Sequence, residues 1–402
     1  MIFKYKAVTN NGESIEGTFE GKSTDEVISM LRGNNYLPVS IEELNEREFK
    51  SSINITINVK KKDMAVFCRQ FYAMLNAGIS IVNCLDILEK QTENKTLKKA
   101  IGQTYEDVQK GMTLSEAMKK NEKVFPILLV NMVEAGEVSG NLDIIMDRMA
   151  IHYEKENKIE NKVKSAFTYP IILIIVSVAV VVFLLTKVMP TFIGMFDNSS
   201  VALPGPTRYL LNMSARLENF WYAYIIIIPL IIIGIKIYGN SPSGRLFFDT
   251  IKIKLPGIKK TNIKIITSRF TRTLSTLLSS GIPLIQSLEV VSRVVGNVIV
   301  AKGLERGIED VKKGASLSST VRDIGVFPPM VYSMINVGEE SGSLDEILLK
   351  TADFYDEEVE TSLEKMTTML EPILIVIMAF IIGFIVIAMA MPMFDMVNTI
   401  EM

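Results

Sequence analysis

One stretch of the sequence occurs twice: Phe67-x-Arg69-x-Phe71-x-x-Met74-Leu75-x-x-Gly78-Ile79 returns as Phe270-x-Arg272-x-Leu274-x-x-Leu277-Leu278-x-x-Gly281-Ile282, with Arg272 lying 203 residues after Arg69. A second stretch, Gly136-Glu137-Val138-Ser139-Gly140-Asn141-Leu142-Asp143, returns 202 residues later as Gly338-Glu339-Glu340-Ser341-Gly342-Ser343-Leu344-Asp345. The same register continues to Pro170 and Pro372 and to Pro190 and Pro392. Such a constant offset predicts that the chain contains one structural unit twice.

Each copy ends in an apolar segment long enough to cross a membrane. Pro170 and Pro190 are 20 residues apart, as are Pro372 and Pro392, and a helix of that length spans roughly 30 Å, the thickness of the hydrocarbon core. A third apolar block begins at Trp221 and contains Pro229. We therefore predict membrane helices over residues 169–190, 221–238 and 371–394.

Basic residues beside these segments predict their orientation. Lysines precede the first segment and many Lys and Arg residues follow the second, whereas residues 191–220 contain only Arg208 and Arg216 and the tail after residue 394 contains neither type. Cytoplasmic flanks are the ones enriched in Lys and Arg. We therefore expect a cytoplasmic N-terminus, an external loop over 191–220, a basic cytoplasmic linker over 239–265 and an external tail over 395–402.

The residues before the repeated spans show helical spacing, as from Met64 to Leu75, and predict cytoplasmic helical domains over 63–168 and 266–370. The last helix of each domain is expected to run unbroken from about Asn141 or Ser343 into the membrane. Residues 1–42 instead alternate apolar and polar residues around Asn11-Gly12, which predicts a small cytoplasmic α+β module followed by a linker over 43–62. The predicted fold class is mainly α: a polytopic membrane protein with two repeated helical-bundle domains, three transmembrane helices and this N-terminal module.

Composition excludes several classes of function. The 402 residues are 48% hydrophobic, and 43 Lys and Arg against 45 Asp and Glu leave a net charge of −2, so no basic field indicates nucleic acid. One histidine and two cysteines argue against metal and His-dependent catalytic sites. We expect no catalytic residue, cofactor or metal, a solvated His152, and buried free thiols at Cys68 and Cys84.

The residues shared by both copies are the candidate structural or interaction sites, namely Arg69, Gly78, Gly136, Glu137, Gly140 and Asp143 in the first and Arg272, Gly281, Gly338, Glu339, Gly342 and Asp345 in the second. Gly136 and Gly338 are expected to end one helix, and Asn141 and Ser343 to cap the next. Asp143 and Asp345 would then lie where the helix dipole favours an anion. We expect ion pairs from Glu137 to Arg69 and from Glu339 to Arg272, with contact to a partner protein as the alternative.

Two further patterns have open interpretations. The acidic run over residues 353–360 predicts a solvated helix face, with a cation or a basic partner as alternatives. In the third span, Ala379-x-x-x-Gly383 with Ala388 and Ala390 forms a small-residue face that suits close helix contact.

These motifs in this order, F-x-R-x-[LF] with a following G-[IL], then G-E-x-S-G-x-L-D, then prolines bracketing each repeated span, resemble the type II secretion system F and type IV pilus PilC protein family. Phe3-x-Tyr5-x-Ala7 with Gly12 and Gly17 is similar to that family's N-terminal segment. The resemblance covers nearly the whole chain. It implies a non-enzymatic platform protein of the bacterial inner membrane, linking a hexameric cytoplasmic ATPase to pilin or pseudopilin subunits as they enter a fibre.

The partners that the resemblance implies are this ATPase, the pilins or pseudopilins, other inner-membrane assembly proteins, the lipid bilayer and further copies of the chain. A small polytopic membrane transporter or a receptor is the alternative function. A transporter would need polar residues facing a cavity at mid-depth, and only Ser177 and Pro229 come near this. A membrane-tethered enzyme would need converging nucleophile and base groups, which the sequence does not show.

Overall fold

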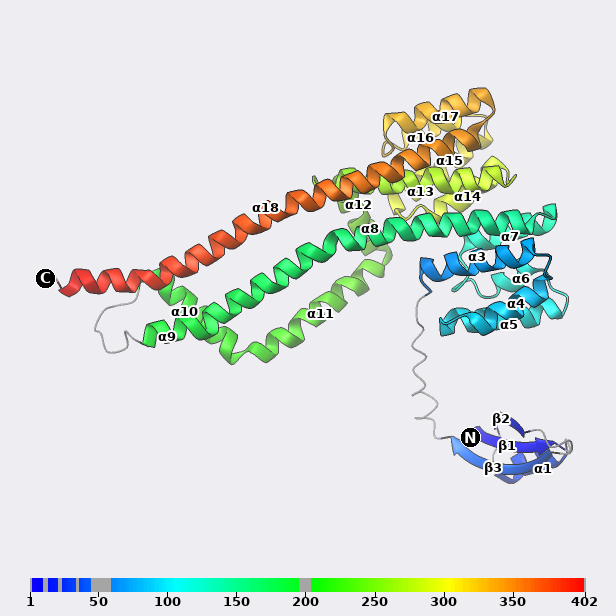
Figure 1. Ribbon diagram of the computed structural model, residues 1–402, viewed down its shortest axis with the longest axis horizontal. Helices are drawn as coiled ribbons and strands as arrows, with labels where there is room; N and C mark the ends of the chain where they lie inside the picture. The colour runs from blue at the N-terminus through cyan, green and yellow to red at the C-terminus, as the bar shows by residue number, and fades with distance from the viewer. Residues whose placement is uncertain are drawn as a thin grey trace. The chain divides into compact units, whose positions relative to one another are not determined.

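The computed structural model describes residues 2–9, 14–20, 24–33, 36–44, 59–194 and 204–400, and the chain divides into two compact units, Met1–Asn58 and Val59–Met402. Figure 1 shows the first unit as a small sheet with one helix and the second as an all-helical body.

The N-terminal unit is a three-stranded antiparallel sheet with one helix. The central strand β1 (Ile2–Thr9) pairs with β2 (Ser14–Glu20) and with β3 (Tyr36–Leu44), which gives the strand order β2-β1-β3. Helix α1 (Thr24–Gly33) contributes Val27 and Leu31 to a core shared with Ala7. The predicted α+β module is confirmed, while its Asn11-Gly12 turn lies outside the described residues.

The second unit contains two matched sets of helices. Lobe 1 consists of α3 (Lys61–Asn76), α4 (Ile81–Gln91), α5 (Lys95–Gln109), α6 (Leu114–Lys119), α7 (Ile127–Ser139) and the first half of α8 (Leu142–Phe183). Lobe 2 consists of α13 (Lys259–Ser279), α14 (Leu284–Val294), α15 (Val298–Lys312), α16 (Leu317–Asp323), α17 (Pro329–Ser341) and the first half of α18 (Leu344–Ile400). The duplication predicted from the sequence is confirmed.

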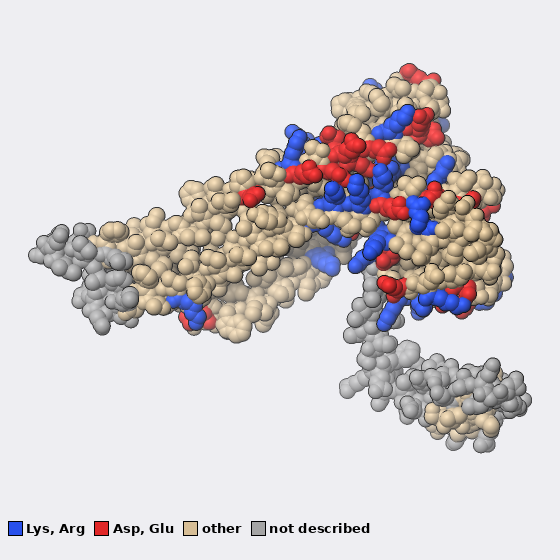
Figure 2. All heavy atoms as spheres, viewed as in Figure 1, with Lys and Arg blue, Asp and Glu red and all other residues tan. Residues whose placement is uncertain are grey.

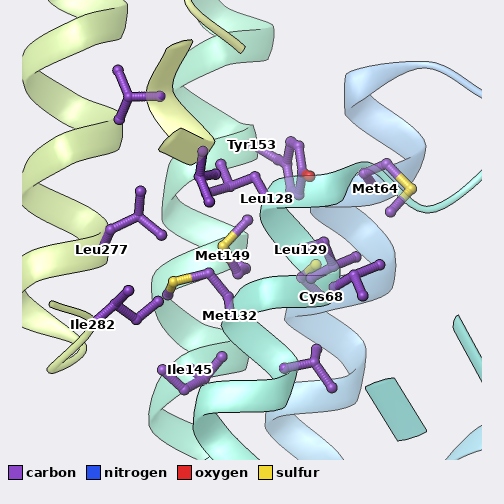
Figure 3. Close-up of a cluster of buried hydrophobic side chains, with 14 of the residues drawn as sticks. Met64, Cys68, Leu128, Leu129, Met132, Ile145, Met149, Tyr153, Leu277 and Ile282 are labelled. Atoms are coloured by element: carbon purple, nitrogen blue, oxygen red, sulfur yellow. The ribbon is translucent and has the colours of Figure 1, made fainter. Parts of the chain in front are cut away.

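Equivalent residues make equivalent contacts in the two lobes. The first helix packs along the long last helix in each, α3 on α8 and α13 on α18. In lobe 1, Phe67 at the start of the repeat packs on Phe125, with ring centroids 5.8 Å apart. In lobe 2, the equivalent Phe270 packs on Phe327, with ring centroids 4.7 Å apart. These rings anchor a buried core that continues into α7 and α8, as Figure 3 shows around Leu129.

Both long helices continue from their lobes into apolar sequence without a break. Helix α8 passes through a π-helical turn, η1 (Leu184–Val188), into α9 (Met189–Gly194), and α18 is 57 residues long. At a rise of 1.5 Å per residue, α18 spans about 85 Å, nearly three bilayer cores. Pro170 and Pro372 lie inside these helices, so the prolines bracketing each repeated span do not end them.

Within the part of the chain that the structure describes, three helices are long and apolar enough to cross a membrane: Leu142–Phe192, Trp221–Asn240 and Leu344–Pro392. Helix α11 (Trp221–Asn240) has no buried residue, which fits a helix that faces lipid. In Figure 2, acidic and basic side chains gather where α8 and α18 leave the lobes, and the remaining length of both helices is nearly free of charge. The chain is therefore a membrane protein.

The region expected to be an external loop contains a helix, α10 (Gly205–Asn219), which ties two membrane helices together. Its Thr207 hydroxyl donates to the Ala388 carbonyl at 2.5 Å, and its Ser214 hydroxyl donates to the Leu185 carbonyl at 2.6 Å. Of the predicted small-residue face, Ala388 is buried in this contact, whereas a Cβ at Gly383 would meet nothing within 4 Å.

The basic segment over 239–265 is helical and packs on lobe 2. It contains α12 (Pro242–Lys254) and the first turns of α13. The buried Asp249 carboxylate accepts a hydrogen bond from the Val298 amide at 3.0 Å, which fixes α12 to the start of α15.

Candidate functional site: the motif residues and the junction between the lobes

The repeated glutamates cap short helices. Glu137 on α7 accepts hydrogen bonds from the amides of Leu114 (2.5 Å) and Ser115 (3.0 Å), the first residues of α6. Glu339 on α17 accepts from the amides of Leu317 (2.6 Å) and Ser318 (3.0 Å) at the start of α16. A helix N-terminus has unpaired N–H groups and a positive dipole end, so a carboxylate there is stabilising.

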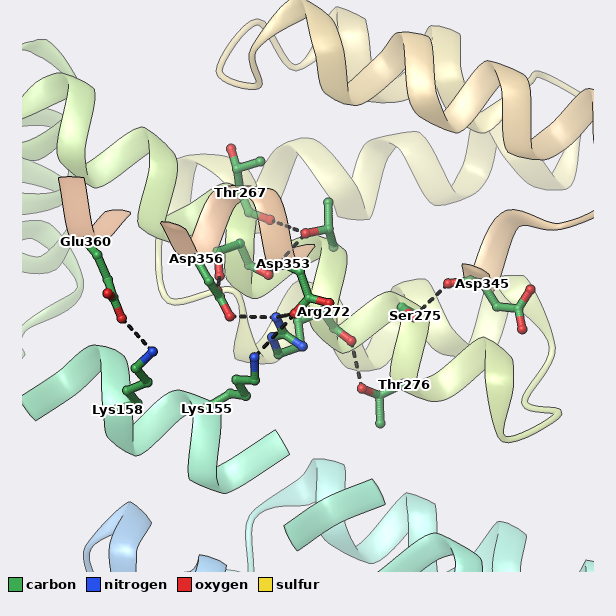
Figure 4. A network of polar contacts seen from close by, with 12 residues as sticks. Lys155, Lys158, Thr267, Arg272, Ser275, Thr276, Asp345, Asp353, Asp356 and Glu360 are labelled. Carbon is green, nitrogen blue, oxygen red and sulfur yellow. Dashed lines mark hydrogen bonds and ion pairs between the residues drawn. The ribbon is translucent and has the colours of Figure 1, made fainter. Parts of the chain in front are cut away.

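The repeated arginines pair with the long helices instead. Arg69 contacts Asp147 at 2.5 Å and Glu154 at 2.9 Å, all within lobe 1. Arg272 contacts Asp353 at 2.8 Å and Asp356 at 2.6 Å in lobe 2 (Figure 4). The predicted pairs of Glu137 with Arg69 and of Glu339 with Arg272 are therefore wrong.

A sequence signal for the correct partner existed. Glu154 and Asp356 are 202 residues apart, the same offset as Tyr153 and Tyr355, so a carboxylate recurs beside the repeated tyrosine. Both lie on the helix that packs against the arginine, one in each lobe. This acidic pair lies outside the longest identical stretches of the repeat, so the shared motifs alone do not single it out.

The glycines of the second motif have two different roles. Helices α7 and α17 end at Ser139 and Ser341, and the left-handed residues after them are Gly140 (φ 74°) and Gly342 (φ 70°). Gly136 and Gly338 lie inside these helices, so the prediction that they end the helices is wrong. A Cβ on Gly338 would come 2.9 Å from the Leu344 Cα, and one on Gly136 would come 2.9 Å from Ile145 Cγ1.

The remaining glycines of the motifs lie at helix ends, and the two aspartates lie as predicted. Gly78 and Gly281 both adopt φ 79° just after the ends of α3 and α13. Asp143 and Asp345 lie in the first turns of α8 and α18, where the dipole favours an anion. Asn141 precedes α8 but its side chain forms no capping hydrogen bond.

Glu156 connects the two lobes through a buried ion triad. From α8 it binds Lys61 of α3, and it also accepts from Nε of Arg269 on α13 at 3.0 Å. The Glu156 side chain is only 9% exposed. Burial raises the pKa of this carboxyl, but the charges of Arg269 and Lys61 outweigh burial and lower it to about 2. The carboxylate therefore stays charged and holds lobe 2 to lobe 1.

Further ion pairs line the contact between α8 and α18. Lys158 binds Glu360 at 2.7 Å, Lys162 reaches the same carboxylate at 3.5 Å, and Lys155 lies 3.4 Å from Asp353 (Figure 4). Asp353, Asp356 and Glu360 of the acidic run are thus paired with basic residues of this chain. The Asp353 side chain is 52% exposed, as expected for a solvated face, whereas those of Glu360 and Asp356 are more covered, at 29% and 15% exposed. Among the described residues, no group of three or more His, Cys, Asp or Glu is arranged to hold a metal ion.

His152 lies inside the junction and is only 5% exposed. The prediction of a solvated histidine is wrong because its face of α8 is covered by lobe 2. Burial lowers the pKa of this imidazole to about 4. The negative charge of Glu156 acts in the opposite direction and raises the pKa, whereas the positive charge of Arg272 lowers it further. Cys68 and Cys84 are free and buried, as predicted.

His152 should make stability depend on pH. Its folded pKa of about 4 lies below the ordinary histidine pKa of 6.5, so the unfolded chain binds the proton more readily between these values. Stability is therefore lost as the pH falls from 6.5 to 4, by about 3 kcal/mol at about 1.4 kcal/mol per pKa unit. The Glu156 carboxylate, with its pKa of about 2, keeps its charge over this window. The other charged groups that face the imidazole are Arg272, Lys61 and Arg269.

Thermal unfolding of the full chain in detergent, followed by circular dichroism, checks this dependence. The difference in stability between wild type and His152→Leu should change by about 3 kcal/mol between pH 7 and pH 4. A constant difference across that window would show that His152 does not titrate in this way.

The described chain is thus a polytopic membrane protein of two equivalent helical lobes, each continuous with its own membrane helix. Comparison with known sequences then gives its family. Residues 67–190 and again 270–392 match the family described as type II secretion system (T2SS), protein F, and residues 1–42 match the N-terminal domain of that protein. The chain belongs to this family.

Relatives match along almost their whole length. Type IV pilus assembly protein PilC of Myxococcus xanthus is 36% identical over 99% of this chain and 96% of the relative. PilC of Thermus thermophilus is 35% identical over 100% of this chain and 99% of the relative. Type II secretion system protein F of Vibrio cholerae is 31% identical, covering 98% of each chain.

Proposed function

We propose that this protein is the non-enzymatic inner-membrane platform of a type IV pilus or type II secretion machine. It couples a hexameric cytoplasmic assembly ATPase to the insertion of pilin or pseudopilin subunits into a growing fibre. It also binds other assembly proteins of the membrane and further copies of itself. The membership in the protein F family, with relatives named for pilus assembly and for secretion, supports this role.

The observation that carries the mechanism is the continuity of α8 and α18. Each helix forms part of a lobe core at one end and an apolar span at the other. A force applied to a lobe tilts or rotates a rigid rod, so the movement reaches the membrane without an intervening loop. The motif residues Glu137, Arg69 and their equivalents keep each lobe rigid enough to transmit that movement.

Co-purification tests the proposed partners. The full-length protein, solubilised in mild detergent from its own bacterium, should retain the assembly ATPase and a pilin or pseudopilin, identified by mass spectrometry. An unrelated polytopic protein of the same membrane serves as the control. Recovery of neither partner after chemical crosslinking in the cells would contradict the proposal.

The proposed topology places the N-terminus and both lobes in the cytoplasm, and α10 and the C-terminus outside. Val138 (87% exposed) and Tyr209 (62% exposed) offer single-cysteine reporters, and the native thiols are buried. An impermeant maleimide should label Tyr209→Cys in intact spheroplasts and Val138→Cys only after lysis. Equal labelling of both variants in intact spheroplasts would contradict this orientation.

A further inference from the structure

Helix α12 begins where the membrane helix α11 ends. Helix α11 ends at Asn240, and α12 starts at Pro242 after the capping residue Ser241. The rings of Tyr238 in α11 and Phe248 in α12 contact each other, with centroids 6.3 Å apart. Figure 1 shows the chain turning at this point, so that α12 leads from α11 to lobe 2. A turn so close to the end of the span places α12 at the membrane surface, on the side of the lobes.

One side of α12 is fixed to lobe 2. The buried Asp249 carboxylate binds the Val298 amide, and Ile253 packs against the buried core. Asp249 and Ile253 are four residues apart, so they share one side of the helix. Because this side is held by contacts with α13 and α15, α12 cannot rotate about its axis. Its other side therefore faces away from the lobe.

That other side carries an apolar stripe, formed by Phe247 and Ile251 of the helix and by Leu255 just after it. The three residues follow each other at steps of four, which aligns them along one side. Phe247 is 54% exposed and Leu255 is 48% exposed, although both side chains are large and apolar. The stripe continues the apolar surface of α11, where Ile237 is 68% exposed. Since α11 faces lipid, lipid is also the nearest apolar surrounding for the stripe.

Basic side chains flank the stripe. At about 100° per residue, Lys254 lies beside Phe247, whereas Arg245 and Lys252 lie on the opposite flank. The exposed basic residues of this segment are Arg245, Lys252, Lys254, Lys259 and Lys260. Asp249 is the only acidic residue between positions 236 and 264, and Lys252 pairs with it. An apolar side between Lys and Arg residues is typical of helices that lie in a membrane surface and bind anionic lipids.

We propose that α12 lies in the surface of the bilayer and binds anionic phospholipid. The stripe enters the boundary between headgroups and acyl chains, and the basic residues bind the negatively charged headgroups. Lobe 2 is thereby fixed to the membrane surface through α12, in addition to its connection through α18. This interaction goes beyond the platform role and does not depend on it.

Fluorescence quenching tests whether the stripe enters the bilayer. Trp221 is the single tryptophan of the chain, so Trp221→Phe/Phe247→Trp places the only tryptophan on the stripe. In nanodiscs whose lipids carry bromine on the upper acyl chain, we expect at least about twofold quenching, because an interfacial helix buries its apolar side roughly 5–10 Å deep. Trp221→Phe/Val337→Trp is the control, since Val337 is 45% exposed on α17. It should show no quenching.

The same reporter tests the preference for anionic headgroups. Two nanodiscs contain the same mixture of phosphatidylglycerol and phosphatidylcholine, and only one of the two lipids is brominated in each. Brominated phosphatidylglycerol should quench the Phe247→Trp reporter at least about threefold more strongly, because the basic residues enrich anionic lipid around α12. High salt should reduce this preference by screening the charges.

Matched charge variants assign the preference to α12. Arg245→Gln/Lys254→Gln/Lys260→Gln removes three exposed basic residues beside the stripe and should abolish the preference for phosphatidylglycerol. Lys252 is kept because it pairs with the buried Asp249. The control removes three exposed lysines of α5, as Lys95→Gln/Lys98→Gln/Lys99→Gln, and should keep the preference.

The proposal is overturned if the Phe247→Trp reporter is not quenched, which would mean that water or protein surrounds the stripe. It is also overturned if both lipids quench equally, or if the triple variant of α12 keeps the preference. Equal quenching together with loss of an acidic partner protein from that variant would assign the basic residues to the partner instead. These measurements use neither the assembly ATPase nor a pilin, so they stand apart from the test of the platform role.

Discussion

Replacing Arg272 by Met should destabilise lobe 2 by about 3 kcal/mol, which is at the lower end of the cost of breaking a buried ion pair. The Arg272 side chain is 5% exposed and pairs with Asp356, whose side chain is 15% exposed. Met keeps the length and removes the charge, so the Asp356 carboxylate stays buried without its cation. The half-exposed Asp353 carboxylate is hydrated by bulk water once Arg272 is gone, which limits the loss of stability.

The repeat provides the control for this substitution. Arg69 occupies the equivalent position in lobe 1 and pairs with two carboxylates, but its side chain is 39% exposed. Arg69→Met should therefore cost only about 1 kcal/mol, the value of an exposed pair. Hydrogen exchange with mass spectrometry measures the opening free energy of each lobe separately. Equal losses in both lobes would contradict the argument from burial.

Gly338→Val should have the other large effect, a loss of about 3 kcal/mol or more in lobe 2. A residue with a side chain usually stabilises the interior of a helix relative to glycine. At position 338 a side chain destabilises the helix instead, because the added Cβ would come 2.9 Å from the Cα of Leu344. That atom belongs to the backbone where α18 begins, so the chain between α17 and α18 must shift.

Two glycines calibrate this prediction. Gly136→Val in lobe 1 should cost less, since its nearest neighbour is the side-chain atom Ile145 Cγ1 and the Leu142 Cα is 3.2 Å away. Gly383→Ala in α18 should be stabilising by up to about 1 kcal/mol, because nothing lies within 4 Å of the added carbon and alanine favours the helix over glycine. Thermal unfolding compares the three variants, and hydrogen exchange measures the loss in lobe 2 for Gly338→Val and in lobe 1 for Gly136→Val. A Gly338→Val protein as stable as wild type would refute the close approach of the helices.

The sequence predicted the architecture well because repetition and hydropathy report on it directly. The offset between Arg69 and Arg272 predicted two lobes, and the two long apolar segments predicted that each lobe continues into a membrane helix. Local capping was also readable: Thr113 and Glu116 form the capping box that their spacing suggests, and α7 and α17 begin just after Pro126 and Pro328. The apolar segments and the caps depend on residues close together in the chain, and the repeat is visible by comparing the sequence with itself.

Features that depend on packing between distant elements could not be read in this way. The repeat offset marks Glu154 as one candidate partner of Arg69, but the choice among the carboxylates of α8 depends on the angle at which α3 crosses α8. The spacing of charges along one helix does not give that angle. His152 is buried because lobe 2 covers α8, although its sequence neighbours are charged. Gly136 resembles a helix end in sequence, but its role comes from the approach of the next helix.

The central claim is that movement of the lobes reaches the membrane through α8 and α18. Lys158 and Glu360 meet across these helices with Nζ and Oε1 2.7 Å apart, just before the apolar spans. A short bis-maleimide applied to Lys158→Cys/Glu360→Cys in living cells clamps the two helices together. The native cysteines are buried and do not compete for the reagent.

Two controls isolate the effect of the clamp. The same double variant treated with a monofunctional maleimide carries the label without the bridge. A bridge between cysteines at Asp86 and Lys90, which pair within α4 at 2.7 Å, tests for damage by crosslinking elsewhere. Fibre assembly, measured as sheared surface pilin or as secreted substrate, is the most direct readout. The account predicts at least a tenfold loss with the α8–α18 bridge and normal assembly with both controls, and normal assembly with the bridge in place would contradict it.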